Sequence, residues 1–168
     1  MMTMLIDAEQ RTPGLPADLR QHVGERALIE LALEAGQTVR ARLSRPLGPE
    51  GQCSPPRLLT LLTYCYASGV YASEDIEYDG RNDPATRHLC ANTAPDQETI
   101  RNFRRANREW IEACLTCVYQ SVCGGAPAPG SRQPRPIPGR QTRSSAEIVN
   151  VVRRKLELAI MIDTAMCE

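Results

Sequence analysis

Residues 96–110 read DQETIRNFRRANREW, and this stretch predicts the start of the helix around which the chain is organised. Pro95 ends whatever precedes it. Asp96 stands where an N-cap residue belongs, because its carboxylate can accept hydrogen bonds from the free backbone N–H groups two and three residues later. Glu98 adds a negative charge at the positive end of the helix. The pattern therefore predicts a helix that begins directly after Asp96.

The same helix has one mostly apolar face. Its members recur at three- and four-residue steps through about five turns, a period that is typical of an amphipathic helix packed on a core. They are Ile100, Phe103, Asn107, Trp110, Ile111, Cys114 and Val118. The spacing predicts a single continuous helix. Phe103 and Trp110 are expected to pack in the core rather than to stack on bases.

Four arginines follow one another at positions i, i+3, i+4 and i+7 of this helix: Arg101, Arg104, Arg105 and Arg108. This spacing places their guanidinium groups on one side, here called the arginine stripe, with no carboxylate inside it. Like charges at i,i+4 cost roughly 0.2–0.5 kcal/mol per pair, so a stripe of this kind favours a nearby polyanion such as DNA. Alternatively, the flanking residues Glu98, Glu109 and Glu112 neutralise an ordinary solvated face. We predict the four arginines as DNA-binding residues, with the second interpretation left open.

The chain has 168 residues with 20 basic and 20 acidic side chains, enough for one domain with its own core plus an extension. The charges are unevenly divided. Residues 1–98 hold 9 basic and 14 acidic side chains, whereas residues 99–168 hold 11 and 6. The basic part therefore begins with the arginine stripe.

Residues 1–6 are followed at once by Asp7 and Glu9, so the start of the chain lacks the basic and apolar segments of a secretory signal. No later apolar run approaches the ~20 residues of a membrane span. We expect a cytoplasmic protein that does not contact a membrane. Its seven cysteines are then expected to be reduced and mostly buried.

Two short helices are predicted near the start, over residues 17–23 and 25–35, with Gly36 as the C-cap of the second. Residues 45–51 are rich in proline and glycine and predict a loop. A helix follows over residues 57–70. Its apolar residues point nearly all round, which is the pattern of a central buried helix.

Ser73 is predicted to cap a short helix over residues 74–78, and the pair Asp79 and Gly80 is predicted to turn the chain. Asp83 with Pro84 then opens another short helix that runs to Cys90. No segment alternates polar and apolar residues with a period of two. The predicted fold class is therefore all-α.

The chain changes character after Cys123. Residues 124–143 contain five prolines and four arginines and predict an extended linker, whose arginines offer a further, nonspecific hold on phosphate. Residues 144–147 read SSAE, a capping box that predicts a final amphipathic helix. The apolar face of that helix is Ile148, Val149, Val152, Leu156, Ala159, Ile160, Ile162 and Met166. The predicted organisation is a tail over residues 1–14, a helical domain over 15–123, the linker, and a C-terminal helix over 144–168.

Other chemistry finds little support. There are enough ligands for zinc in Cys114, Cys117 and Cys123 together with His88 and Cys90. However, Cys114 and Cys117 lie within a long predicted helix, and the sequence has no second Cys-x-x-Cys motif to complete a zinc site. The two histidines have no nucleophile or acid at a telling spacing. We predict no catalytic residue, no metal and no cofactor.

The run from residue 55 to residue 105 resembles the N-terminal domain of bacterial DDE-type insertion-sequence transposases. The shared features are a proline-led Leu-rich helix, a Ser-led short helix with Ile-Glu, an Arg-x-Leu segment and an Asp-x-x-Thr-Ile-x-x-Phe-Arg-Arg helix. They are carried by Pro56, Leu58, Leu59, Leu62, Tyr66, Gly69, Ser73, Ile76, Glu77, Arg87, Leu89, Asp96, Thr99, Ile100, Phe103, Arg104 and Arg105. The resemblance spans about residues 15–123. It implies a small multi-helix domain with a helix-turn-helix-like portion that binds the ends of a mobile element.

The chain departs from that family after residue 123. In such transposases the long helix leads into a strand with the first catalytic Asp, and a ribonuclease-H-like domain supplies two more carboxylates. Here the acids after Cys123 are Glu147, Glu157, Asp163 and Glu168, all on or near one predicted helix. We therefore expect a truncated relative that binds mobile-element DNA and is not an enzyme. The alternative is a protein–protein module whose final helix pairs with a second copy or with an intact transposase and inhibits it.

Overall fold

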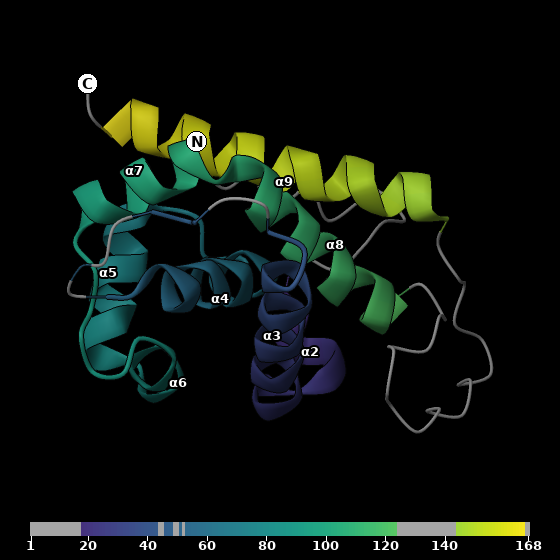
Figure 1. Cartoon of the computed structure of the whole chain (residues 1–168), viewed down its shortest axis with the longest axis horizontal. Helices are drawn as coiled ribbons and strands as arrows, with labels where there is room; N and C mark the ends of the chain where they lie inside the picture. Colours follow the sequence, from purple (N-terminus) through teal and green to yellow (C-terminus); the bar gives the residue numbers. More distant parts are fainter. Residues whose placement is uncertain (1–17, 44–45, 49–50, 52, 124–143, 167–168) are drawn as a thin grey trace, which may run out of the picture.

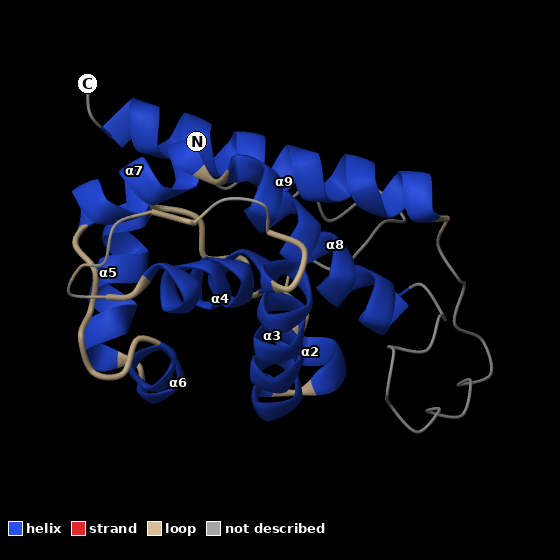
Figure 2. Ribbon diagram, viewed as in Figure 1, coloured by secondary structure: helices blue, strands red, loops and turns tan. Residues whose placement is uncertain are grey.

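The computed structural model describes residues 18–43, 46–48, 51, 53–123 and 144–166. In this part of the chain the secondary structure consists of helices joined by loops, with no strands (Figure 2). This finding confirms the predicted all-α class. The first helix among the described residues, α2 (Arg20–Val23), is shorter than predicted. The predicted tail over residues 1–14 and the predicted linker over 124–143 lie outside the described residues, as does part of the predicted loop over 45–51.

The central helix is α4 (Pro55–Ala67), which runs through the middle of the molecule in Figure 1. Its first turn contains Pro55 and Pro56, where the missing backbone N–H groups cost nothing. From Leu58 to Ala67 every residue is buried. α3 (Glu25–Arg40) and α8 (Arg108–Cys123) pack against it and against each other. The prediction of a central buried helix is confirmed.

Gly36 does not end its helix, contrary to the prediction, because α3 continues to Arg40. Gly36 is buried against α4, and a Cβ added there would lie 2.8 Å from Oγ1 of Thr60. The glycine therefore permits a close approach of two helices.

Gly80 gives a second correction of the same kind. The predicted turn at Asp79 and Gly80 is part of α5 (Ser73–Asn82). A Cβ on Gly80 would lie 3.0 Å from the Cβ of Ala94, so this glycine also marks a tight packing contact. α6 (Pro84–Leu89) follows α5 directly and packs beside it.

The predicted continuous helix beyond Asp96 is two helices, α7 (Gln97–Ala106) and α8, which meet at Asn107. Asn107 has φ −126° and ψ 27°, outside helical geometry. Its buried Nδ2 donates to the carbonyl of Leu47 at 2.8 Å and to that of Phe103 at 3.2 Å. Asn107 therefore interrupts the helix because its side chain bonds to backbone, which lets α8 turn and pack against α3 and α4.

The predicted helix starts are confirmed at three places. Asp83 accepts a hydrogen bond from the backbone N–H of Thr86 at 2.9 Å, and Asp96 accepts one from that of Thr99 at 2.7 Å. Ser144 and Glu147 form the reciprocal bonds of a capping box at the start of α9 (Ser145–Met166).

The C-terminal helix α9 lies across the outside of α7 and α8 (Figure 1). It packs mainly on α8, with Ile148, Val152, Leu156 and Ala159 buried in the same core as the preceding helices. These four belong to the predicted apolar face. A domain boundary at residue 123 stays a prediction, but the two sides of that boundary share one core.

Candidate nucleic-acid interface

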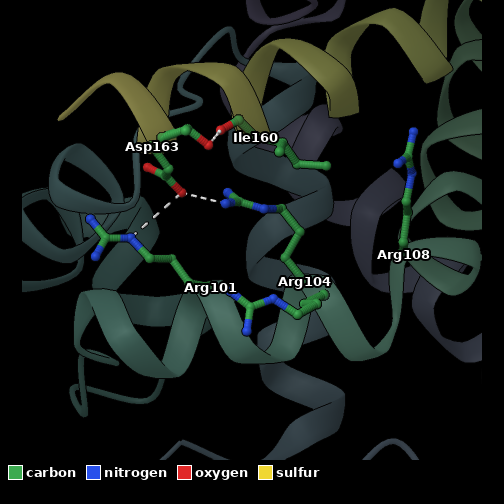
Figure 3. A pocket seen from close by; sticks show the side chains of 7 residues that line it. Arg101, Arg104, Arg108, Ile160 and Asp163 are labelled. Carbon is green, nitrogen blue, oxygen red and sulfur yellow. Dashed lines mark hydrogen bonds and ion pairs between the residues drawn. The ribbon is translucent and has the colours of Figure 1, made fainter. Parts of the chain in front are cut away.

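The break at Asn107 divides the arginine stripe between two helices. Arg101, Arg104 and Arg105 lie on α7, whereas Arg108 is the first residue of α8. In Figure 3, Arg101 and Arg104 extend from α7 toward α9, and Arg108 extends from α8. The interpretation of the four arginines as one straight, open stripe is therefore wrong in its geometry.

Arg104 is buried, with 5% of its surface exposed. One of its terminal nitrogens donates to the hydroxyl oxygen of Tyr66 at 3.2 Å, and the other donates to Oδ2 of Asp163 on α9. Burial opposes the charge of Arg104, but the interactions with Tyr66 and Asp163 outweigh it and raise its pKa. Burial also raises the pKa of the Tyr66 hydroxyl to about 12, although the nearby guanidinium opposes this shift.

Asp163 joins α9 to two other helices. Its Oδ1 accepts from the backbone N–H of Ser73 at 2.9 Å, and its Oδ2 accepts from the Ser73 hydroxyl at 2.5 Å as well as from Arg104. Ser73 is the first residue of α5, so the carboxylate of Asp163 caps that helix from a distant part of the chain. Burial alone would raise the pKa of Asp163. The hydrogen bonds from Ser73 and Arg104 prevail and lower it.

The other three arginines are more accessible. Nε of Arg101 lies 3.9 Å from Oδ2 of Asp163, with 28% of its side chain exposed. Arg108 is 45% exposed and lies 3.8 Å from Glu157 of α9. Arg105 is exposed and has no ionic partner among the described residues. Arg105 and Arg108 can therefore reach solvent anions directly, and Arg101 can do so in part.

A groove between α7 and α9 collects these side chains (Figure 3). We call it the arginine groove. It has a volume of about 400 Å³ and is lined by Arg101, Arg104, Arg105, Arg108, Ile160, Asp163 and Thr164. Asp163 is the one acid among these described lining residues, against four guanidinium groups. Such a site attracts anions, and guanidinium groups bind phosphate and carboxylate oxygens in pairs.

Two members of this site are not predicted from the sequence, namely Asp163 and the backbone N–H of Ser73. The sequence identifies Asp163 only as an acid of the last helix and predicts that Ser73 caps its own helix. In the structure the Ser73 side chain forms no cap; its hydroxyl donates to Asp163 instead. One signal was present: an aspartate at position 163 stands among the apolar residues of an amphipathic helix, and a buried acid requires a partner.

The described cysteines do not form a second site. Cys53, Cys65, Cys90 and Cys114 are buried, as the sequence predicted for most of them. Burial raises the pKa of Cys53 to about 11 and that of Cys114 to about 12, so both stay protonated near neutral pH. Within the described residues, no three His, Cys, Asp or Glu side chains gather as metal ligands would, and no helix is long and apolar enough to cross a membrane.

Comparison with known proteins places the larger part of this fold in one family. The family described as "Transposase domain (DUF772)" matches residues 20–106, which is slightly more than half of the chain. The match starts at α2 and ends with α7, so it includes Arg101, Arg104 and Arg105 but neither Arg108 nor α9. Among curated proteins and among solved structures, no match to this chain reaches significance. On the family match, the chain belongs to the transposase-domain family DUF772.

Proposed function

We propose that this protein is a DNA-binding module of transposase origin that holds the phosphate backbone of mobile-element DNA along the arginine groove. The observation that carries the proposal is the gathering of four arginines at one groove whose described lining contains a single acid. Nucleic acid is the common biological polyanion, and guanidinium groups dominate phosphate contacts. Membership of a transposase-domain family makes DNA the first polyanion to test.

The arginines differ in how they would contribute. Arg105 has no ionic partner in the described part of the chain, and Arg108 has only a half-exposed pair with Glu157, a kind of pair worth about 0.2–1 kcal/mol. A backbone phosphate can therefore compete for both. Arg101 would assist from the edge of the groove, whereas Arg104 faces Asp163.

The proposed activity is binding without strand cleavage. Two-metal phosphoryl transfer requires carboxylates that converge on the metals. The described acids that follow Cys123 are engaged elsewhere: Glu147 caps α9, Glu157 pairs with Arg108, and Asp163 bonds to Ser73 and Arg104.

The alternative of protein–protein pairing through the C-terminal helix has a structural cost. Ile148, Val152, Leu156 and Ala159 are already buried in the core. A second copy or an intact transposase could use this face only after α9 left α8. DNA binding needs no such step, which favours it as the first function to test.

The experiment is a salt titration of DNA binding by the full chain, with a labelled duplex of unrelated sequence. We expect the logarithm of affinity to fall linearly with the logarithm of salt concentration. The double variant Arg105→Gln/Arg108→Gln should lower the slope by roughly 0.9 for each duplex phosphate that the variant no longer binds. Gln keeps helix propensity nearly unchanged, so folding should survive.

The matched control is Arg26→Gln/Arg87→Gln. It removes the same charge from two exposed positions on α3 and α6. This control should keep the wild-type salt slope. If both double variants behave alike, or if the wild type shows no salt-dependent binding, the arginine groove is an ordinary solvated surface and the proposal fails.

A further inference from the structure

The carboxylate of Asp163 occupies a site built for an oxyanion. Three hydrogen bonds reach it, from the backbone N–H and the hydroxyl of Ser73 at the start of α5 and from the guanidinium of Arg104, and the charge of Arg101 lies nearby, with its Nε at 3.9 Å. Arg104 is buried and is positioned by Tyr66. The N-terminus of a helix together with arginines is an arrangement that binds phosphate groups as well as carboxylates.

The part of α9 that carries Asp163 is held less firmly than the rest. The buried apolar contacts of α9 end at Ala159. Beyond that residue, Ile160 and Ile162 are only partly buried, Met161 is 67% exposed, and Thr164 and Ala165 are exposed. The last turns of a helix open at low free-energy cost when few apolar contacts hold them. Asp163 is the one buried side chain among residues 160–165, so its bonds to Ser73 and Arg104 are a main contact of this end of α9.

We propose that Asp163 is an internal substitute for a backbone phosphate, so that the end of α9 competes with DNA for Arg101 and Arg104. This inference rests on the proposed DNA binding and adds its regulation. With Asp163 in place, DNA contacts chiefly Arg105 and Arg108, because Asp163 engages Arg104 fully and Arg101 in part. When residues 160–166 open, a phosphate takes the position of the carboxylate, and DNA then also binds Arg101 and Arg104. The first turns of α9 stay packed on α8.

The test compares Asp163→Asn with Glu30→Gln in the full chain, with the same labelled duplex and salt titration. Each variant removes one negative charge. Glu30 lies on α3 in an exposed pair with Arg26, away from the arginine groove. We expect Asp163→Asn to bind roughly tenfold more tightly at about 0.1 M salt for each arginine freed, and to steepen the salt slope by about 0.9 for each additional phosphate bound. Glu30→Gln should keep the wild-type slope.

A third variant assigns the increase in slope to the freed arginine. Adding Arg104→Gln to Asp163→Asn should remove about half of that increase when both arginines acquire phosphates. An increase that persists in full would overturn the role of Arg104.

Hydrogen exchange of the unmodified chain provides a measurement that does not depend on the stability of a variant. On addition of the duplex, backbone amides of residues 160–166 should exchange faster, while those of residues 148–159 stay protected. Unchanged or slower exchange at residues 160–166 would overturn the inference.

The outcomes separate the two proposals. If the wild type binds DNA with a salt-dependent slope but Asp163→Asn matches Glu30→Gln, the internal competition is refuted and the proposed function stands. If no variant binds the duplex at low salt, both are refuted.

Discussion

Burial and hydrogen bonding act in opposite directions at Asp163. Removal of the carboxylate from water disfavours its charge, whereas the hydrogen bonds from Ser73 and Arg104 favour it and prevail, so that the pKa is lowered. Arg104 faces the same conflict with the opposite charge and also stays ionised. Each of these two buried charges is therefore stabilised by the other. Removal of either one leaves a buried charge.

The lowered pKa of Asp163 predicts a pH dependence of stability. The unfolded chain has an Asp pKa of about 3.9, and the folded value lies below it. The contribution of Asp163 is therefore complete above about pH 4 and is lost as the pH falls through the folded pKa. Asp163→Asn should lower the free energy of unfolding by roughly 1.5–3 kcal/mol near neutral pH, the usual value of hydrogen bonds to a charged group. Urea unfolding across acidic pH should show this difference shrinking.

Asp96→Asn is the matched control for this measurement. The carboxylate of Asp96 is exposed, and its pKa is lowered chiefly by the backbone N–H of Thr99. Asn caps helices about as well as Asp, so the control should lose little stability at any pH. A difference between wild type and Asp163→Asn that stays constant down to the lowest pH would show that the carboxylate is not ionised in the folded protein.

Among the helices, the sequence predicts correctly those features whose interacting residues lie close together along the chain. Asp83, Asp96 and Ser144 were predicted correctly because each cap bonds to a group three residues away. The predictions for Gly36 and Gly80 are wrong because each glycine is required by its packing against a residue of another segment, Thr60 and Ala94 respectively.

The candidate site follows the same rule. The spacing of the arginines is evident in the sequence. The end of α7, however, depends on a hydrogen bond from Asn107 to the carbonyl of Leu47, which is 60 residues away in the chain. The partner of Arg104 lies 59 residues away. Neither pairing has a local signal, because each depends on how whole helices dock.

The close approach of α3 and α4 gives a prediction for Gly36. Gly36→Ala would place a Cβ 2.8 Å from Oγ1 of Thr60, so the helices must separate or Thr60 must rotate. We expect a loss of about 1–3 kcal/mol in the free energy of unfolding, as for other overpacked cores. In the background Thr60→Ala the obstructing oxygen is absent. The same change should then be neutral or stabilise by up to about 1 kcal/mol, because Ala favours helix over Gly.

A double-mutant cycle by urea unfolding measures this coupling. The variants are Gly36→Ala, Thr60→Ala and their combination. We expect the double variant to lose less free energy of unfolding than the sum of the losses of the two single variants. Equal losses in both backgrounds would mean that Gly36 is needed for its backbone rather than for the approach of α4.

At the scale of the whole molecule, α9 belongs to the core while its sequence lies outside the family match. Residues 20–106 match the transposase-domain family, and α8 and α9 complete the packing around them. α9 covers α8 with apolar residues and meets α7 with a charge. The first half of α9 therefore buries apolar surface, whereas the second half neutralises the charge of Arg104.

A variant that ends after Cys123 keeps the helices from α2 to α8 and lacks α9. The helices from α2 to α8 keep the packing among α3, α4 and α8, so unfolding should stay cooperative, with a lower midpoint because α8 loses its apolar cover. The loss of Asp163 also changes what Arg104 does. Arg104→Met should destabilise the full chain, because it leaves Asp163 buried without its cation, whereas in the shortened chain it should be neutral or stabilising. Thermal unfolding of the four proteins measures this reversal of sign. A shortened chain without a cooperative transition would place the boundary of the folding unit beyond α8, and an equal loss in both chains would mean that Arg104 is held by Tyr66 rather than by α9.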